Sequence, residues 1–276
     1  MNNSRALPLR RTVLKWALGV AVPLLLAACA TQPASAPPAG TEVRVITSGA
    51  FTEAYKQLVP VFEKQSGYKI VSAYGASMGK APDSIPSRLE RGEAVDIVIM
   101  AGPALDNLIA QGKVVAGSRV DLVRSSVGFA VKTGAPKPDI STVEKLKQTL
   151  LNAKSIAYSA SASGTYFSTE LVQKLGIADQ VLPKSKQILS ERVGTVVARG
   201  DAELGLQQVS ELVPIKGIDY IGPLPEPVQQ VTYFSAGIVK NAKEPAAARA
   251  LIKFFTSPQA APIIEKTGLE PVLSKP

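Results

Sequence analysis

The regular alternation of short β-branched runs with amphipathic stretches, which begins at Thr41, constrains the fold more than any other feature. Residues 43–47 are typical of a strand, and residues 52–65 follow with apolar side chains at helical spacing. Residues 69–74 have the pattern of a second strand, and residues 96–100 are strongly apolar, as in a parallel strand covered on both faces. This order predicts a doubly wound α/β sheet with a ligand crevice beyond the carboxyl ends of its strands.

A second α/β pattern begins with a predicted strand at residues 127–132. We expect helices at 141–151, 165–175 and 193–199, with strands at 155–158 and 203–207. A long strand at 230–239 and helices at 244–256 and 258–267 then close the chain. The chain from Thr41 onward has about 235 residues. Because a domain usually holds about 100–200 residues, this length favours two lobes over one.

The composition excludes several classes of function. There is no histidine and a single cysteine, so neither the usual zinc or copper ligand sets nor Ser–His–Asp catalysis can be assembled, and no cofactor or metal is expected. Catalysis would have to use Asp, Glu, Lys, Tyr or a metal held by oxygen atoms. No cluster of Lys and Arg is interleaved with aromatic residues, which argues against nucleic-acid binding.

The first residues have the pattern of an export signal. Arg10 and Arg11 precede an uncharged, mostly apolar run at 16–28, which is too short to span a bilayer because a helix needs roughly 20 residues for that. The sequence Leu26-Ala27-Ala28-Cys29 resembles a bacterial lipoprotein cleavage box. The resemblance implies cleavage before Cys29, a lipid on its sulfur, and contact with the membrane through that lipid alone. The paired arginines also resemble a twin-arginine signal, so two export routes stay open.

We expect residues 29–40, rich in Ala, Pro, Ser and Thr, to form a flexible spacer between the anchor and the folded part. Ala30, which follows the cysteine in place of Asp, would favour the outer membrane in a Gram-negative cell. Residues 1–28 hold four basic and no acidic residues, so the rest of the chain has 27 basic against 22 acidic residues, a net charge of +5. This modest excess favours a small anionic ligand.

Three loops rich in small polar residues each follow a predicted strand and precede a predicted helix, at 47–50, 75–79 and 159–165. The N–H groups at the start of a helix are unpaired, and glycine lets the backbone approach a ligand closely, so such loops are suited to anions. One such loop is usually only a helix cap, but three on the same side of an α/β fold indicate a ligand cleft. The candidate contacts are Ser48, Gly49, Ala50, Ser77, Met78, Ser163, Gly164 and Thr165.

Five stretches, in order and spacing, resemble a type II periplasmic solute-binding protein, nearest to the molybdate-binding branch: 43–50, 91–99, 175–177, 193–208 and 257–261. The resemblance implies a two-lobed fold, with residues 41–126 plus 235–276 in one lobe and 127–234 in the other. It further implies a monomer in the periplasm that closes on a small anion and partners the permease of an ABC transporter.

The ligand residues of the molybdate branch carry over only in part. Its two serines fall at Ala50 and Ser77, with Ser48 close to the first, and its second-lobe contacts fall at Ser163 and Val193 through backbone N–H groups. Its tyrosine falls at Gln207 or Gln208. With extra residues at about 80–86, these departures favour a di- or tricarboxylate over molybdate. Arg192, beside Val193, is as consistent with a carboxylate contact as with a surface charge.

An enzyme on the same scaffold is the alternative to a binding protein. The chain also resembles, in overall form, the bacterial aconitate isomerases, which are periplasmic. Interconversion of cis- and trans-aconitate requires a proton to leave one carbon and return at another while cations hold the carboxylates. The base would have to be a carboxylate, Lys, Tyr or an activated Ser, and the sequence does not single one out. An adhesion lipoprotein would fit the anchor but would not explain the three loops.

Overall fold

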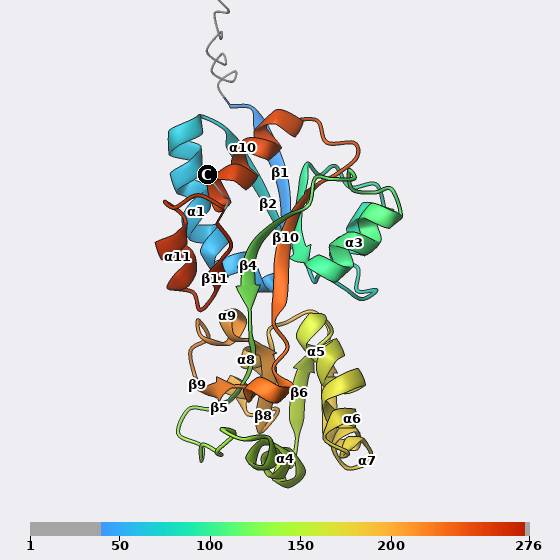
Figure 1. The fold of residues 1–276 in the computed structure, drawn as a ribbon, viewed down its shortest axis with the longest axis vertical. Helices are drawn as coiled ribbons and strands as arrows, with labels where there is room; N and C mark the ends of the chain where they lie inside the picture. The colour runs from blue at the N-terminus through green and yellow to red at the C-terminus, as the bar shows by residue number, and fades with distance from the viewer. Residues whose placement is uncertain (1–39, 274–276) are drawn as a thin grey trace, which may run out of the picture. The chain divides into compact units, whose positions relative to one another are not determined.

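The computed structural model describes residues 40–273. The expected signal at 1–28, the lipidation site Cys29 and all but the last residue of the spacer lie outside these residues. The described part forms two mixed β-sheets with helices on both faces (Figure 1). We refer to each sheet with its helices as a lobe. Within the described part, no helix combines the length and the apolar character needed to cross a membrane.

Lobe 1 is built on a six-stranded sheet with the order β11-β4-β10-β3-β1-β2. The strands are β1 (Glu42–Thr47), β2 (Lys69–Tyr74), β3 (Ile97–Ala101), β4 (Val120–Ser125), β10 (Thr232–Ile238) and β11 (Glu270–Pro271). The helices are η1 (Gly49–Phe51), α1 (Thr52–Ser66), α2 (Ile85–Glu90), α3 (Gly102–Ala110), α10 (Pro245–Phe255) and α11 (Ala261–Glu265). Strands β1, β2 and β3 run parallel, whereas β10 is antiparallel to both β3 and β4.

Lobe 2 is built on a five-stranded sheet with the order β7-β6-β8-β5-β9. The strands are β5 (Val127–Lys132), β6 (Ile156–Ser159), β7 (Ser185–Ile188), β8 (Leu204–Gln208) and β9 (Ile218–Pro223). The helical segments are α4 (Val143–Asn152), α5 (Ala162–Tyr166), η2 (Phe167–Leu171), α6 (Val172–Lys174), α7 (Ala178–Val181), η3 (Leu182–Lys184), α8 (Val193–Arg199), α9 (Val209–Leu212) and η4 (Glu226–Val228).

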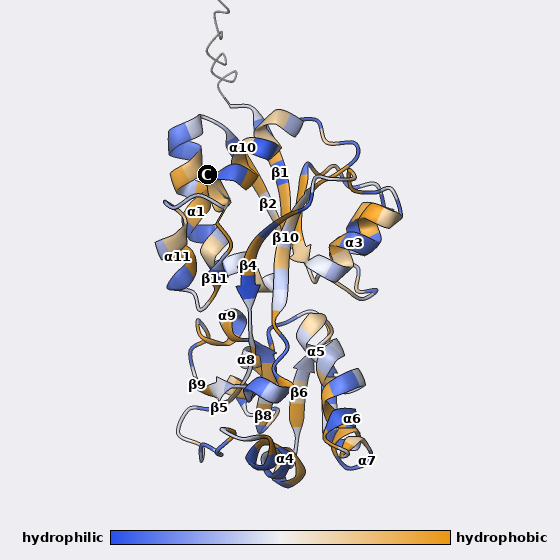
Figure 2. Cartoon of the chain, viewed as in Figure 1, coloured by the Kyte–Doolittle hydropathy of each residue, from blue (hydrophilic) through white to orange (hydrophobic). Residues whose placement is uncertain are grey.

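Each lobe has an apolar core of its own. Figure 2 shows the hydrophobic segments of the strands and helices in orange. In lobe 1, Tyr55 and Leu58 of α1 are buried in the core. The rings of Phe51 and Phe255 pack edge to face there, with 5.3 Å between their centroids. In lobe 2, Phe129 and other fully buried side chains hold the helices on β5, β6 and β8. Burial of one such side chain contributes roughly 1.5–3 kcal/mol, so each lobe has a substantial source of stability.

The chain passes from lobe 1 to lobe 2 between β4 and β5, and returns between β9 and β10. Strand β10 (Thr232–Ile238) lies within the strand expected at 230–239, and Thr232–Phe234 pair with β4. The expected helix at 165–175 begins earlier, at Ala162, and is interrupted by the π-helical turn Phe167–Leu171. The loops after β1, β2, β6 and β7 all reach one cavity between the sheets, as expected for this α/β arrangement, and the end of β8 with α9 adds Gln207 and Glu211.

Candidate ligand-binding cleft

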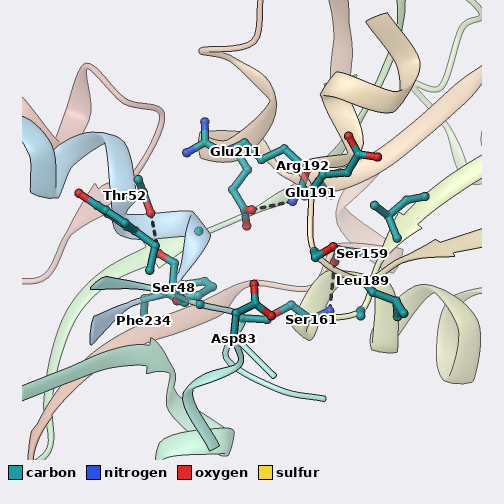
Figure 3. A pocket seen from close by; sticks show the side chains of 18 of the residues that line it. Ser48, Thr52, Asp83, Ser159, Ser161, Leu189, Glu191, Arg192, Glu211 and Phe234 are labelled. Carbon is teal, nitrogen blue, oxygen red and sulfur yellow. Dashed lines mark hydrogen bonds between the residues drawn. The ribbon is translucent and has the colours of Figure 1, made fainter. Parts of the chain in front are cut away.

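A cavity of about 330 Å³ lies between the two lobes. Figure 3 shows Ser48, Thr52 and Phe234 on its lobe 1 side and Ser159, Ser161 and Leu189 on its lobe 2 side, to which Arg192 and Glu211 also belong. Small-molecule pockets commonly measure roughly 300–1,000 Å³, so this cavity is large enough for an organic ligand of several carbons.

The wall from lobe 1 presents a hydroxyl that is buried and free. The N–H of Ser48 donates to the carbonyl of Ile99 at 2.8 Å, and its carbonyl accepts from the Thr52 hydroxyl at 3.1 Å. Its Oγ is buried and has no hydrogen-bond partner within residues 40–273. An unpaired buried hydroxyl is costly, so Ser48 is prepared to bind a polar ligand atom.

A buried carboxyl group stands in the wall from lobe 2. Glu211, in the short helix α9, is 8% exposed, and its carboxylate accepts from Gln207 Nε2 at 2.6 Å. Burial raises the pKa of Glu211 to about 7, although the charge of Arg192 and the Gln207 hydrogen bond act in the opposite direction. A cavity carboxyl that titrates near neutral pH is a typical sign of a functional group.

The orientation of the Gln207 amide is fixed by two contacts. Gln207 Oε1 accepts from the N–H of Val193 at 2.9 Å, which leaves Nε2 to donate to Glu211. The N–H at the start of α8 is therefore occupied by the protein itself. The predicted contact between the Val193 N–H and a ligand would require this hydrogen bond to be exchanged, and it stays a prediction.

Positive charge enters the cleft through Arg192, which precedes α8. Its guanidinium donates to Glu53 Oε1 at 2.8 Å, and Lys56 Nζ lies 3.6 Å from the same oxygen. Burial opposes ionisation of Glu53, but Arg192 and Lys56 hold its pKa below the usual value. Because Glu53 and Lys56 belong to α1 and Arg192 to lobe 2, this ion pair joins the two lobes across the cleft.

The loop after β6 adds hydroxyls to the lobe 2 side of the cavity. Ser159 Oγ and Ser163 Oγ lie 3.1 Å apart, and the N–H of Ser161 donates to Ser159 Oγ at 3.4 Å. Gly164 packs so closely on the Ser159 backbone that any side chain there would overlap it. Ser159 and Ser161 line the cavity, whereas Ser163 and Gly164 are buried and lie outside the lining.

Among the residues predicted for the site, Ser48, Gly49 and Arg192 line the cavity. Ala50 is buried in lobe 1, and the Ser77 hydroxyl accepts from the N–H of Ala101 at 2.9 Å, so neither residue lies in the lining. Buried Gln208 is also outside it, although both amide atoms lack a partner in the described chain.

Met78 and Thr165 line a second cavity, of about 320 Å³, which also takes residues from both lobes. They therefore lie apart from Ser48 and Arg192, and share this second cavity with Arg119 and Tyr233.

Sequence reasoning missed Glu211, Glu53 and Lys56. The sequence holds one signal for Glu211, because it is the only charged residue between Leu204 and Val213. Such an isolated acidic residue is rarely buried without a reason. Glu53 and Lys56 occupy the polar face of a helix, where nothing in the sequence distinguishes them from solvent-exposed charges.

Two α/β lobes that enclose a polar cavity with donors from both sides define an anion-binding protein of the periplasmic type. Residues 43–270 match the model of the bacterial extracellular solute-binding proteins, and the chain belongs to this family. Over 247 residues it is 44% identical to the aconitate isomerase of a Pseudomonas species, covering 90% of this chain and 94% of that one.

The molybdate-binding branch is also represented among its relatives. The chain is 28% identical over 265 residues to a molybdate-binding protein of Azotobacter vinelandii, covering 91% of this chain and 96% of the relative. The solved structure of a periplasmic molybdate-binding protein from that organism has a TM-score of 0.67 at 22% identity, covering 84% of this chain and all of the other. The predicted fold and the resemblance to the molybdate-binding branch are therefore confirmed.

Proposed function

We propose that this chain is an isomerase that interconverts cis- and trans-aconitate in the cleft between its lobes. The observation that carries the proposal is the composition of the cavity, which brings the guanidinium of Arg192 and the ammonium of Lys56 together with hydroxyls from both lobes. Three substrate carboxylates need such donors on several sides. The 44% identity to the Pseudomonas aconitate isomerase over nearly the whole chain supports the same reaction.

The reaction moves one proton and one double bond. A base removes a proton from the methylene carbon of aconitate, and the electron pair of that C–H bond spreads over the allylic carbons and the adjoining carboxylate. The proton returns at the former vinylic carbon, and the double bond re-forms with the other geometry. No atom is gained or lost. Cations and hydroxyls fixed around the carboxylates would stabilise the charge that develops between the two steps.

The residues around the cleft favour a tricarboxylate over a tetrahedral oxyanion. The two serine positions implied by the molybdate branch are Ala50, which has no hydroxyl, and Ser77, whose hydroxyl is bonded to Ala101. A single tetrahedral anion would also leave much of the 330 Å³ cavity unfilled. These departures are consistent with a larger ligand that carries several carboxylates.

A ligand screen with an activity assay tests the proposal. Thermal unfolding of the chain from Cys29 onward is measured with cis-aconitate, trans-aconitate, citrate, sulfate and molybdate. A ligand at a hundredfold excess over its Kd adds about 2.7 kcal/mol to the free energy of unfolding. We expect both aconitates to raise the Tm and to interconvert in a chromatographic assay. Stabilisation by molybdate alone would contradict the proposal.

A passive solute-binding protein is the second candidate, because the family and the molybdate-binding relatives favour it. In that case the lobes would close on a carboxylate and the closed form would deliver it to the permease of an ABC transporter. The same sample separates the two functions, since a binding protein would be stabilised by aconitate without converting it.

We further propose that the mature chain is a periplasmic lipoprotein tethered through Cys29. The Leu-Ala-Ala-Cys sequence at the end of the apolar run supports this. In cells, Cys29→Ser is expected to move the protein from the membrane fraction to the soluble fraction or to leave the signal uncleaved. Retention of a processed Cys29→Ser protein on the membrane would contradict the lipid anchor.

A further inference from the structure

We infer that Glu211 is the group that carries the proton between the two carbons of the tricarboxylate, with Gln207 and Gly49 as its positioning residues. This inference rests on the isomerase function proposed above. It assigns the base that the reaction requires and that the sequence alone left open among several residue types.

The surroundings of Glu211 distinguish it from the other titratable groups in the cavity lining. Lys56, Tyr74 and Glu191 are exposed, and Asp83 is half-buried. Glu191 also accepts two hydrogen bonds from Arg199, at 2.7 and 3.0 Å, and its pKa is lowered. Of the lining carboxyl groups, Glu211 alone is buried and free of a direct ion pair in the described residues.

The elements around Glu211 explain why it can both take and return a proton. Lobe 1 covers it with η1, which contributes no charged side chain, and β8 contributes the neutral Gln207. Arg192 is the charged group that acts on it from the start of α8. With burial raising its pKa to about 7, Glu211 is well matched to general acid–base work near neutral pH.

Gly49 belongs to lobe 1, whereas Glu211 belongs to lobe 2. A Cβ atom on Gly49 would lie 2.7 Å from Glu211 Cδ and closer still to Oε2, so only glycine permits this approach. The burial of the carboxyl group therefore depends on the contact between the two lobes. This contact leaves Glu211 only 8% exposed, and the exclusion of water makes its carboxylate a stronger base.

The proton transfer balances without any other reactant. The methylene C–H bond breaks, its proton goes to one Glu211 oxygen, and its electron pair stays on the substrate. The same oxygen then returns the proton to the former vinylic carbon, at the other end of the allylic system, the double bond re-forms between the central carbon and the former methylene carbon, and Glu211 is again ionised. Arg192 would hold a substrate carboxylate throughout and would offset the negative charge next to Glu211.

The inference is tested with Glu211→Gln, which keeps the size and hydrogen-bonding capacity of the side chain and removes the base. We expect kcat for aconitate to fall by about 10²–10⁴-fold, the usual contribution of general acid–base catalysis. The Kd of aconitate, measured by calorimetry, should stay equal or decrease, because a negative charge beside an anionic ligand has been removed. Glu211→Asp is expected to recover part of the activity. Glu90→Gln, at an exposed position at the end of α2, is the matched control and should behave like the wild type.

The pH profile gives a readout that a structural role would not affect. Only ionised Glu211 can accept the proton, so kcat/KM of the wild type should fall about tenfold per pH unit below its pKa of about 7. The residual kcat/KM of Glu211→Gln should not show this decrease at low pH. If the wild type converts aconitate and the kcat of Glu211→Gln is within threefold of the wild-type value, this inference is overturned and the proposed isomerase function stands. A wild type that binds aconitate without converting it would overturn both.

Discussion

Replacement of Arg192 by Gln is expected to raise the Kd of aconitate about a hundredfold. Loss of one partner of a desolvated charge pair costs about 2–5 kcal/mol, and about 1.4 kcal/mol corresponds to a factor of ten. The Arg192 side chain is 24% exposed, so water screens it only partly. The acid limb of the rate profile should also move to higher pH, because the charge of Arg192 holds the Glu211 pKa down.

Glu53→Gln separates ligand binding by Arg192 from a purely mechanical role. Glu53 Oε1 accepts a hydrogen bond from the Arg192 guanidinium at 2.8 Å, so it holds the group that we expect to bind a substrate carboxylate. If a substrate carboxylate takes that place, Glu53→Gln removes a competitor, and the Kd should stay equal or decrease. If the ion pair merely ties the lobes together, both variants should weaken binding to a similar degree, which would contradict our assignment. Arg124→Gln, which removes an exposed ion pair with Glu270 within lobe 1 and lies outside the cavity lining, is the control and should bind normally.

The parts of the fold that the sequence predicted well are those with strong local patterns. The strands at 69–74 and 127–132 and the helix at 193–199 have the expected bounds, because alternation, apolar runs and helical spacing are properties of adjacent residues. The strands Val120–Ser125, Ser185–Ile188 and Ile218–Pro223 were not predicted. Their residues are mostly half-buried or exposed and carry little apolar periodicity, so their pairing comes from the sheet.

The candidate site was predictable to a smaller degree, because its chemistry arises between lobes. Ser48, Gly49 and Arg192 were accessible from loop composition and resemblance. The burial of Glu211 was not, since it depends on Gly49 from a segment about 160 residues away in the chain. The Arg192–Glu53 pair likewise joins residues 139 positions apart. No local pattern can show that two distant charges become partners.

Replacement of Gly49 by Ala is expected to lower kcat for aconitate by about a hundredfold with a much smaller effect on Kd. The new methyl group would meet all three carboxyl atoms of Glu211 at short range and nothing else nearer. Because that carboxyl group is the end of a flexible side chain, it can move away, and we expect the move to break its hydrogen bond from Gln207, since Oε2 is both the acceptor and the atom nearest the new methyl group. A displacement of about 1 Å in a reacting group can cost a factor of 10² in rate. Steady-state kinetics together with calorimetric Kd values measure the two effects separately.

The double variant Gly49→Ala/Glu211→Gln shows whether Gly49 acts through Glu211. If the methyl group slows the reaction only by displacing the base, it has nothing left to displace once the base is gone. The double variant should then be as slow as Glu211→Gln alone, since residues that act as one unit give strongly non-additive losses. Multiplication of the two losses would instead mean that Gly49 contributes by another route, such as direct backbone contact with the substrate. In that case the contact between Gly49 and Glu211 would result from the packing of the two lobes and would not position the base.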